Sequence, residues 1–226
     1  MNSNTIFYLL FLVGLGAFAQ QKTASELQPF EELKVFDKIN VTLVQADQNR
    51  ITISGPQKDE IAVVEKDGVL KLKMSLDNLW DEKDATKVTI FYTTVKTIDA
   101  NEGASVLVKD SLVQESLKLS VQEGAKIKGK IVVKKLVSKS VTGGVIEVHG
   151  SSNSQDITIK AGGQYETQKL VSDSTHVSIS AGGRASINAK LFVKATTTAG
   201  GTIKIYGSPR LIDSKKVFGG KIIEIN

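Results

Sequence analysis

The 226-residue sequence contains no cysteine, three prolines and few aromatic residues. Without cysteine we expect no disulfide framework, no thiolate nucleophile, no cysteine-ligated zinc or iron–sulfur centre and no lipid-anchoring cysteine. Arginine is scarce as well, and the lysines are scattered singly, although the formal net charge is +5. Nucleic-acid-binding proteins gather basic and aromatic side chains on one face, so the sequence predicts no nucleic-acid partner.

Long hydrophobic runs are missing except near the N-terminus. Residues 6–13 are apolar, the first 19 residues include no charged side chain, and the small residues Ala17 and Ala19 follow the run. This pattern predicts a secretory signal peptide over 1–19, with cleavage before Gln20. No run approaches the ~20 apolar residues of a membrane span. We therefore expect an exported protein that does not span the membrane after cleavage.

Glycine is plentiful, and from residue 100 onward it recurs in regular steps. The second residues of successive steps lie 18 to 21 positions apart. Repetition at this period is typical of a solenoid, in which each unit buries its apolar face against copies of itself. The steps are Glu102-Gly103, Glu123-Gly124, Gly143-Gly144, Gly162-Gly163, Gly182-Gly183, Gly200-Gly201 and Gly219-Gly220.

Small or apolar residues alternate with polar ones on both sides of these steps, so each set shares one face of a strand. The pattern predicts an all-β fold, a parallel β-helix with about 20 residues per coil, in which each coil has a strand, a glycine bend, a second strand and a polar turn. Hairpin turns of an antiparallel sandwich are the alternative, which the fixed offsets from the glycines disfavour. The predicted inward residues are Ile157, Ile159, Ala161, Val177, Ile179, Ala181, Ala195, Thr197 and Ala199 before the steps, and Ile146, Val148, Tyr165, Thr167, Ala185, Ile187, Ile203 and Ile205 after them.

The first third of the chain has strand patterns of shorter spacing. We expect antiparallel or irregular β-structure there, acting as the N-terminal cap that a solenoid needs to cover its open edge. The predicted strands are 33–35, 39–46, 50–54, 61–65, 69–74, 87–92 and 95–100. The predicted organisation is a flexible leader over 20–29, a β cap with the first strands over 30–100, and solenoid repeats over 101–226, with 30–226 forming one continuous domain.

Several of these segments resemble one family of exported proteins. Residues 200–209, Gly-Gly-Thr-Ile-Lys-Ile-Tyr-Gly-Ser-Pro, with Val217-Phe218-Gly219-Gly220-Lys221-Ile222, resemble the closing Gly-x-Ile-x-Tyr-x-Gly-x-Pro element of the head GIN domain family. Phe36-x-x-Ile39-x-Val41-x-Leu43 and Gly68-x-Leu70-x-Leu72 resemble the start of that family. The resemblance covers about residues 30–226. It implies a right-handed parallel β-helix, an auto-transporter adhesin of the kind common in Bacteroidetes, and no established catalytic residues. It also implies a location in the periplasm or at the outer surface of a Gram-negative bacterium.

Two carboxylates raise the possibility of catalysis. Glu147 and Glu166 both lie three residues after a repeat glycine, between inward positions. On adjacent coils they would be about 5 Å apart, close enough to raise each other's pKa or to bind a cation. A polysaccharide lyase or hydrolase that uses these outward carboxylates is therefore the alternative function. The simpler interpretation is a solvated ladder in which nearby lysines relieve the repulsion.

The remaining candidates are a tryptophan and two histidines. Trp80, the only tryptophan, lies among the acidic residues of 77–84, where it could stack on a sugar or contact a partner. His149 and His176 have different offsets from the preceding glycine, so we expect them on different sides of the coil and predict no metal site and no cofactor. Asp156 and Asp213 share one offset but lie on separate coils.

A polar strip is the strongest candidate for a binding surface. Its hydroxyl residues alternate with the predicted inward residues and therefore face outward. Flat, regular ladders of this kind suit extended ligands. The sequence thus predicts a non-catalytic cell-envelope binding or adhesion module for a cell-surface polysaccharide or an envelope protein, and the stack ends offer a route to a homo-oligomer. The candidate surface comprises Thr158, Ser178, Ser180, Thr196 and Thr198, with Glu147, Glu166 and Trp80 as further candidates.

Overall fold

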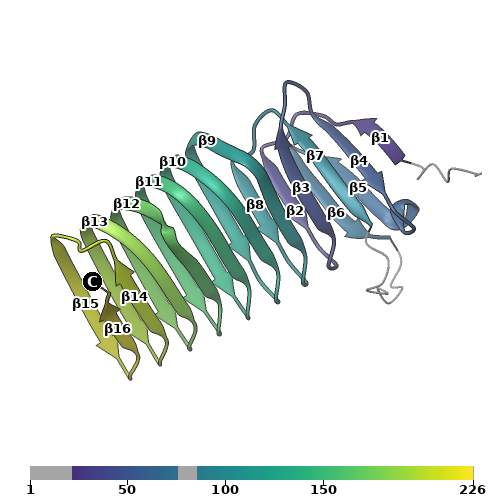
Figure 1. Cartoon of the computed structure of the whole chain (residues 1–226). Coiled ribbons are helices and arrows are strands. Elements are labelled where there is room, and N and C mark those ends of the chain that lie inside the picture. The colour runs from purple at the N-terminus through teal and green to yellow at the C-terminus, as the bar shows by residue number, and fades with distance from the viewer. Residues whose placement is uncertain (1–21, 76–85, 226) are drawn as a thin grey trace, which may run out of the picture.

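The computed structural model describes residues 22–75 and 86–225, so the predicted signal peptide over 1–19 and Trp80 lie outside the described residues. Strands account for 72% of the structure, and the chain winds into a β-solenoid of about seven turns with about 19 residues per turn (Figure 1). Within the described ranges, the single helical element is the short 3-10 turn η1, Lys58–Glu60. The predicted all-β solenoid and its coil length are confirmed.

From residue 105 onward each complete coil is one long strand. Successive strands pair in parallel from β9 to β13, and the last coil continues this stack with β14 and β15 on β13 and β16 on β14. Parallel pairing excludes the hairpin alternative here. The strands are β9 (Ser105–Val121), β10 (Lys126–Val141), β11 (Val145–Lys160), β12 (Gln164–Ser180), β13 (Arg184–Thr198), β14 (Thr202–Tyr206), β15 (Leu211–Val217) and β16 (Lys221–Glu224).

The break in each coil is a tight corner with two consecutive left-handed residues. At one corner Thr142 has φ 48° and Gly143 has φ 72°, and the Gly144 amide donates to the Val141 carbonyl at 3.0 Å. The left-handed glycine needs its backbone freedom. The glycine after it serves a different purpose, because a Cβ on Gly163 would lie 2.3 Å from the carbonyl oxygen of the coil before it.

The corners also correct two details of the predicted repeat. In the first two full corners the close-approach position holds Ala104 and Ala125, so the steps read from the sequence were one residue out of frame there. Ala161, Ala181 and Ala199 were expected to face inward, but each is the exposed first residue of a corner with positive φ. The strand also continues through the second bend of the coil, where a separate polar turn was predicted.

The core runs along the inside of the coils. Apart from the three corner alanines, the predicted inward residues are buried, and Ile159 and Ile179 have no exposed surface, which confirms the period-two alternation. Tyr165 is the largest of these side chains and is fully buried, and its hydroxyl donates to the Gln155 side-chain oxygen at 2.7 Å. Burial raises the pKa of Tyr165 above its usual range. The hydrogen bond satisfies a hydroxyl that would otherwise be costly to bury.

The solenoid extends further toward the N-terminus than the sequence indicated. β3 pairs in parallel with β7 and β9, and β2 pairs in parallel with β6 and β8, so antiparallel pairing is limited to β1–β4, β4–β7 and β5–β6. The predicted flexible leader is wrong over 22–26, because these residues form β1 on the edge of β4. The bounds are β1 (Lys22–Glu26), β2 (Glu32–Val35), β3 (Asn40–Gln45), β4 (Arg50–Ser54), β5 (Ile61–Lys66), β6 (Val69–Met74), β7 (Lys87–Tyr92) and β8 (Thr97–Ala100).

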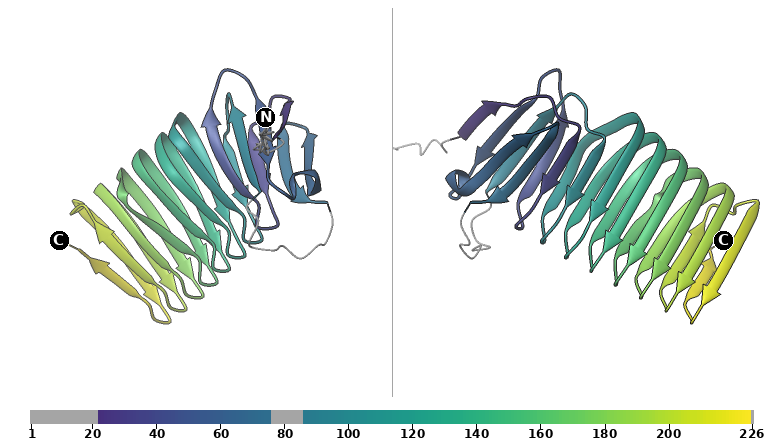
Figure 2. Two further views of the ribbon diagram at one scale, coloured as in Figure 1. Left: turned by 45° about the vertical axis from the view of Figure 1, so that its right-hand side comes forward. Right: turned by 180° about the vertical axis from the view of Figure 1, so that it is seen from behind.

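The two ends of the stack differ. Figure 2 shows the antiparallel strands gathered at the N-terminal end, while the C-terminal end finishes with the short strands of the last coil. Between them, the strand segments before and after each corner stack in parallel register, which sets their outward side chains in columns. Glu147, Glu166 and the candidate hydroxyl residues all lie on these strand segments.

Candidate binding face

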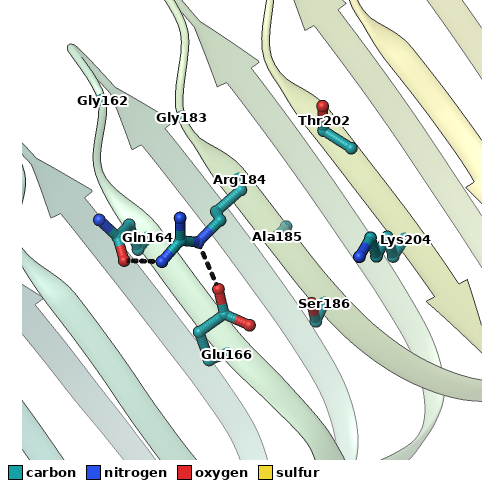
Figure 3. Close-up of a pocket in the computed structure, with 9 residues that line it drawn as sticks. All are labelled: Gly162, Gln164, Glu166, Gly183, Arg184, Ala185, Ser186, Thr202 and Lys204. Carbon is teal, nitrogen blue, oxygen red and sulfur yellow. Dashed lines mark hydrogen bonds and ion pairs between the residues drawn. The ribbon is translucent and has the colours of Figure 1, made fainter.

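The segments that follow the corners carry a groove on their outward side, and we call this surface the Arg184 face. The groove has a volume of about 600 Å³ and spans β12, β13 and β14 (Figure 3). Its outward side chains form two columns. Gln164, Arg184 and Thr202 are register partners in one column, and Ser186 and Lys204 are partners in the other. Because the backbone fixes the column spacing, these side chains keep their places without a dedicated loop.

Arg184 is held in place at the centre of this groove. Its Nε donates to Glu166 Oε1 at 2.6 Å, and its Nη2 donates to Gln164 Oε1 at 2.6 Å, as Figure 3 shows. The Arg184 side chain is still 60% exposed, whereas that of Glu166 is 28% exposed. A guanidinium carries five donors in a planar fork. Arg184 can therefore keep both bonds and still offer N–H groups to a carboxylate, sulfate or phosphate.

Glu147 belongs to a second ion-pair group on the same face. Lys128 Nζ lies 2.9 Å from Glu147 Oε2, and Lys126 Nζ lies 3.4 Å from the same oxygen. The hydrogen bond from Lys128 lowers the pKa of Glu147, and the same bond raises the pKa of Lys128. Glu147 is therefore an ionised member of a solvated network at neutral pH.

The expected carboxylate pair does not form. Glu166 is bound by Arg184 of the next coil, while Glu147 is bound by lysines of the preceding coil. The parallel register between β11 and β12 is also interrupted between Ile146 and Gly150. The expectation that the two carboxylates raise each other's pKa is wrong for Glu147, because cationic neighbours lower its pKa.

The segments that precede the corners carry the predicted polar strip, which we call the threonine face. Thr158, Ser178 and Thr196 are register partners on β11, β12 and β13, and Ser180 and Thr198 are partners in the adjoining row. Ser178 is exposed and the other four are half-buried. The structure thus brings this part of the candidate surface together, but Glu147 and Glu166 lie on the Arg184 face and Trp80 is outside the described residues.

One column of the threonine face could not be found from the sequence. Asp156, His176, Lys194 and Asp213 are successive register partners, although only Asp156 and Asp213 share an offset from the preceding repeat glycine. The coil containing β12 gains a residue at the bend opposite the corner, so offsets counted from the corner drift beyond that bend. His176 also packs edge-on against Phe192, with ring centroids 5.7 Å apart. His149 lies in a different column beside Lys130, as expected from its offset.

Acidic side chains gather at the corner column near the cap. Asp37 and Glu102 occupy equivalent left-handed positions of neighbouring corners, and the Met74 amide donates to Asp37 Oδ2 at 2.8 Å. A hydrogen bond with Asp37 and the negative charges of Asp37 and Glu123 raise the pKa of Glu102. Sequence reasoning treated Glu102 and Glu123 only as parts of glycine steps, did not consider Asp37, and so missed the cluster.

The described surface presents hydrogen-bonding and charged groups in fixed columns. Across 22–75 and 86–225, no group of three or more His, Asp or Glu is placed to hold a metal ion. The Arg184 face offers a fixed guanidinium and exposed ammonium groups, and the threonine face offers hydroxyls. Over the same ranges no helix has the length and apolar character needed to cross a bilayer.

Comparison with known proteins identifies the family to which this chain belongs. Residues 29–209 match a family model described as "Putative auto-transporter adhesin, head GIN domain". The chain belongs to the head GIN domain family. That assignment confirms the resemblance carried by residues 200–209 and by the Phe36 and Gly68 segments. No protein with a curated functional description matches the chain.

Solved structures of low sequence identity share the head GIN fold. A putative adhesin from Bacteroides fragilis superposes with a TM-score of 0.84 at 21% identity, covering 92% of this chain and 98% of its own. A putative lipid binding protein from Parabacteroides distasonis has a TM-score of 0.71 at 15% identity, and a putative adhesin from Parabacteroides merdae has 0.71 at 17%. Each of these two covers 93% of this chain and 98% of its own. At these identities the likeness establishes the fold.

Proposed function

We propose that this head GIN domain protein is an exported, non-catalytic adhesion module of the cell envelope, and that the Arg184 face binds an acidic polysaccharide lying along the stack. The family description supports an adhesive role and a location outside the cytoplasm or at the surface. The single observation that carries the partner's chemistry is the groove around Arg184, where a guanidinium is fixed by two hydrogen bonds and keeps donors free.

Charge supports an anionic partner. Residues 104–226 contain 18 Lys or Arg against nine Asp or Glu. On the Arg184 face both carboxylates are already paired with cations, and Lys204 lines the groove. The stacked strands repeat about every 4.8 Å along the solenoid, so an extended polymer meets similar chemistry on each coil. Uronate carboxylates suit a guanidinium fork that can bond two oxygens at once.

The test measures binding of polygalacturonate to the mature protein by calorimetry at low and moderate salt, with neutral dextran as the comparison polymer. We expect salt-sensitive binding of polygalacturonate alone. The double variant Arg184→Ala/Lys204→Ala should bind at least about tenfold more weakly, because each charge-assisted hydrogen bond contributes on the order of 1.5 kcal/mol. The matched control Lys139→Ala/Lys194→Ala removes two cations from the threonine face and should bind as the wild type does.

Other outcomes would contradict the proposal. Loss of binding in the control pair alone would move the site to the threonine face. Binding of anionic phospholipid vesicles in place of polygalacturonate would favour the chemistry named for the Parabacteroides distasonis neighbour. New reducing ends or unsaturated product from polygalacturonate, abolished by Glu147→Gln/Glu166→Gln, would establish the enzyme alternative.

A further inference from the structure

The last coil leaves strand edges without a partner in the described part of the chain. β15 pairs only with β13, and β16 pairs only with β14. The Val217 carbonyl accepts from the Ala199 amide of the previous coil at 2.9 Å. Peptide groups of alternate residues point to opposite edges of a strand, so Ile212, Ser214 and Lys216 direct their N–H and C=O groups to the free edge. An open edge of this kind is a template for another strand.

The sequence of β15 is complementary to itself when two copies run antiparallel about Ser214. Ser214 then faces Ser214 of the second copy, and Ile212 faces Lys216. These three residues are the ones whose peptide groups point to the free edge. Asp213 faces Lys215 in the intervening non-hydrogen-bonded position, where opposed side chains are closest. Asp213 and Lys215 both lie in outward columns, as partners of Lys194 and Thr196.

Other antiparallel registers are disfavoured. Centring the pair on Asp213, Lys215 or Lys216 sets like charges directly opposite each other, which destabilises a strand pair. Centring it on Ile212 pairs only residues 211–213 of β15 with one another and sets Ser214 and Lys215 against residues outside the strand. The Ser214 register pairs all seven residues of β15 and sets Asp213 opposite Lys215 twice. Charged residues on an edge strand usually discourage pairing with another chain. Here they favour one antiparallel register over the others.

Exposed apolar side chains in the last coil fit the same arrangement. Leu211 is 61% exposed and Phe218 is 88% exposed. The Ser214 register sets Leu211 against Val217 of the second copy and brings Phe218 toward its Arg210, a pairing suited to a cation–π contact. Phe218 occupies the left-handed corner position that holds Ala, Thr or Glu in the coils before it, with φ 55°.

We propose that two copies of this chain join end to end through antiparallel β15 strands, with Ser214 on the two-fold axis. Because the pairing is isologous and uses the free β15 edge of both copies, the assembly closes at two. The dimer would place two sets of outward columns on one elongated body and strengthen attachment to a polymer through avidity. It does not depend on which polymer, if any, the columns bind.

The test is the mass of the mature protein by light scattering and sedimentation up to about 0.1 mM. We expect a dimer for the wild type and monomers for Asp213→Lys and for Lys215→Asp, because each single change sets like charges opposite each other twice. An equimolar mixture of the two single variants should form a heterodimer, and the double variant Asp213→Lys/Lys215→Asp should dimerise again. Asp156→Lys, the same change three coils earlier, should leave the dimer intact.

Circular dichroism will show that the single variants keep their strand content, since both positions are exposed. A monomeric wild type would overturn the proposal. So would open-ended polymers, single variants that remain dimeric, or single variants that fail to complement each other when mixed.

Discussion

The Arg184 face and the threonine face are built from the same coils and carry a similar excess of positive charge, yet they differ in shape and in how their charges are held. The main columns of the Arg184 face contain five cations and two carboxylates, and both carboxylates are bound by cations. The three columns of the threonine face contain five lysines and two aspartates. Its hollow near His176 has a volume of about 230 Å³, compared with about 600 Å³ around Arg184.

Net charge alone therefore does not select a face. A polyanion would be attracted to both faces at low salt. A fixed guanidinium in a groove adds directional hydrogen bonds, and these distinguish the Arg184 face. The predictions below separate what the two faces share, which is the core and the corners, from what distinguishes them.

The largest effect should come from the core that lies between the faces. Ile179→Asp places an unpaired charge at a fully buried position, which costs several kcal/mol, so we expect loss of cooperative folding and of both faces. Ser178→Asp, one residue away and exposed on the threonine face, should change the free energy of unfolding by less than about 1 kcal/mol. Thermal unfolding followed by circular dichroism measures both, and equal damage from the two variants would contradict the assigned facing.

The next effect concerns the corner that joins the two faces. In Gly163→Ala the new Cβ would meet the Ser140 carbonyl oxygen at 2.3 Å, and we expect a destabilisation of about 2 to 3 kcal/mol. Gly162→Ala adds a Cβ with nothing within 4 Å, at φ 77°. We therefore expect only backbone strain, which lowers the free energy of unfolding by about 1 kcal/mol. Denaturant unfolding gives the two values. The reverse order would show that backbone conformation, rather than close approach of coils, requires the paired glycines.

A smaller effect should appear in ligand binding. Glu166→Gln removes the anion that holds Arg184 and should tighten binding of polygalacturonate by about threefold, in keeping with the modest strength of exposed ion pairs. Asp156→Asn removes one negative charge from the threonine face and serves as the matched control. Calorimetry compares the two, and equal tightening would point to net charge as the cause.

The smallest effect is a pH dependence on the Arg184 face. The pKa of Glu147 is lowered from 4.5 by Lys128, so the ion pair stabilises the fold above pH 4.5 and is lost as the pH falls through the depressed pKa. An NMR titration of the Glu147 side-chain carboxyl should give a midpoint below 4.5, and Lys128→Met should raise it. Lys139→Met on the threonine face should leave that midpoint unchanged.

The difference between the faces also explains what could be predicted from the sequence. Every corner from residue 102 onward has a left-handed glycine, so glycine spacing revealed the coil length, and the alternation beside it revealed Ile159 and Ile179 as core residues. The opposite bend has no such requirement and absorbs extra residues, as the shifted register after Ile146 shows. The column from Asp156 to Asp213 was therefore missed. The sequence also did not reveal that β2 and β3 join the stack beside strands that come later in the chain.

The pairing of charged side chains across coils was the other feature that could not be predicted from the sequence. Equal offsets placed Glu147 and Glu166 correctly on one face, but the reach of Lys128 and Arg184 decides which charges meet. That choice depends on flexible side chains across coils and has no signature in spacing. The turn chemistry was similarly ambiguous, because Asp67-Gly68 uses the same pair of left-handed residues to make the β5–β6 hairpin that other pairs use to make a corner.

The most direct measurement is lysine labelling of the mature protein with and without polygalacturonate, read residue by residue by mass spectrometry. Both faces carry accessible lysines, so general attraction would protect Lys139 and Lys194 as strongly as Lys128 and Lys204. We predict protection of Lys126, Lys128 and Lys204 on the Arg184 face, with little change at Lys118, Lys139 and Lys194. Equal protection of both faces, or protection of the threonine face alone, would contradict the proposed binding face.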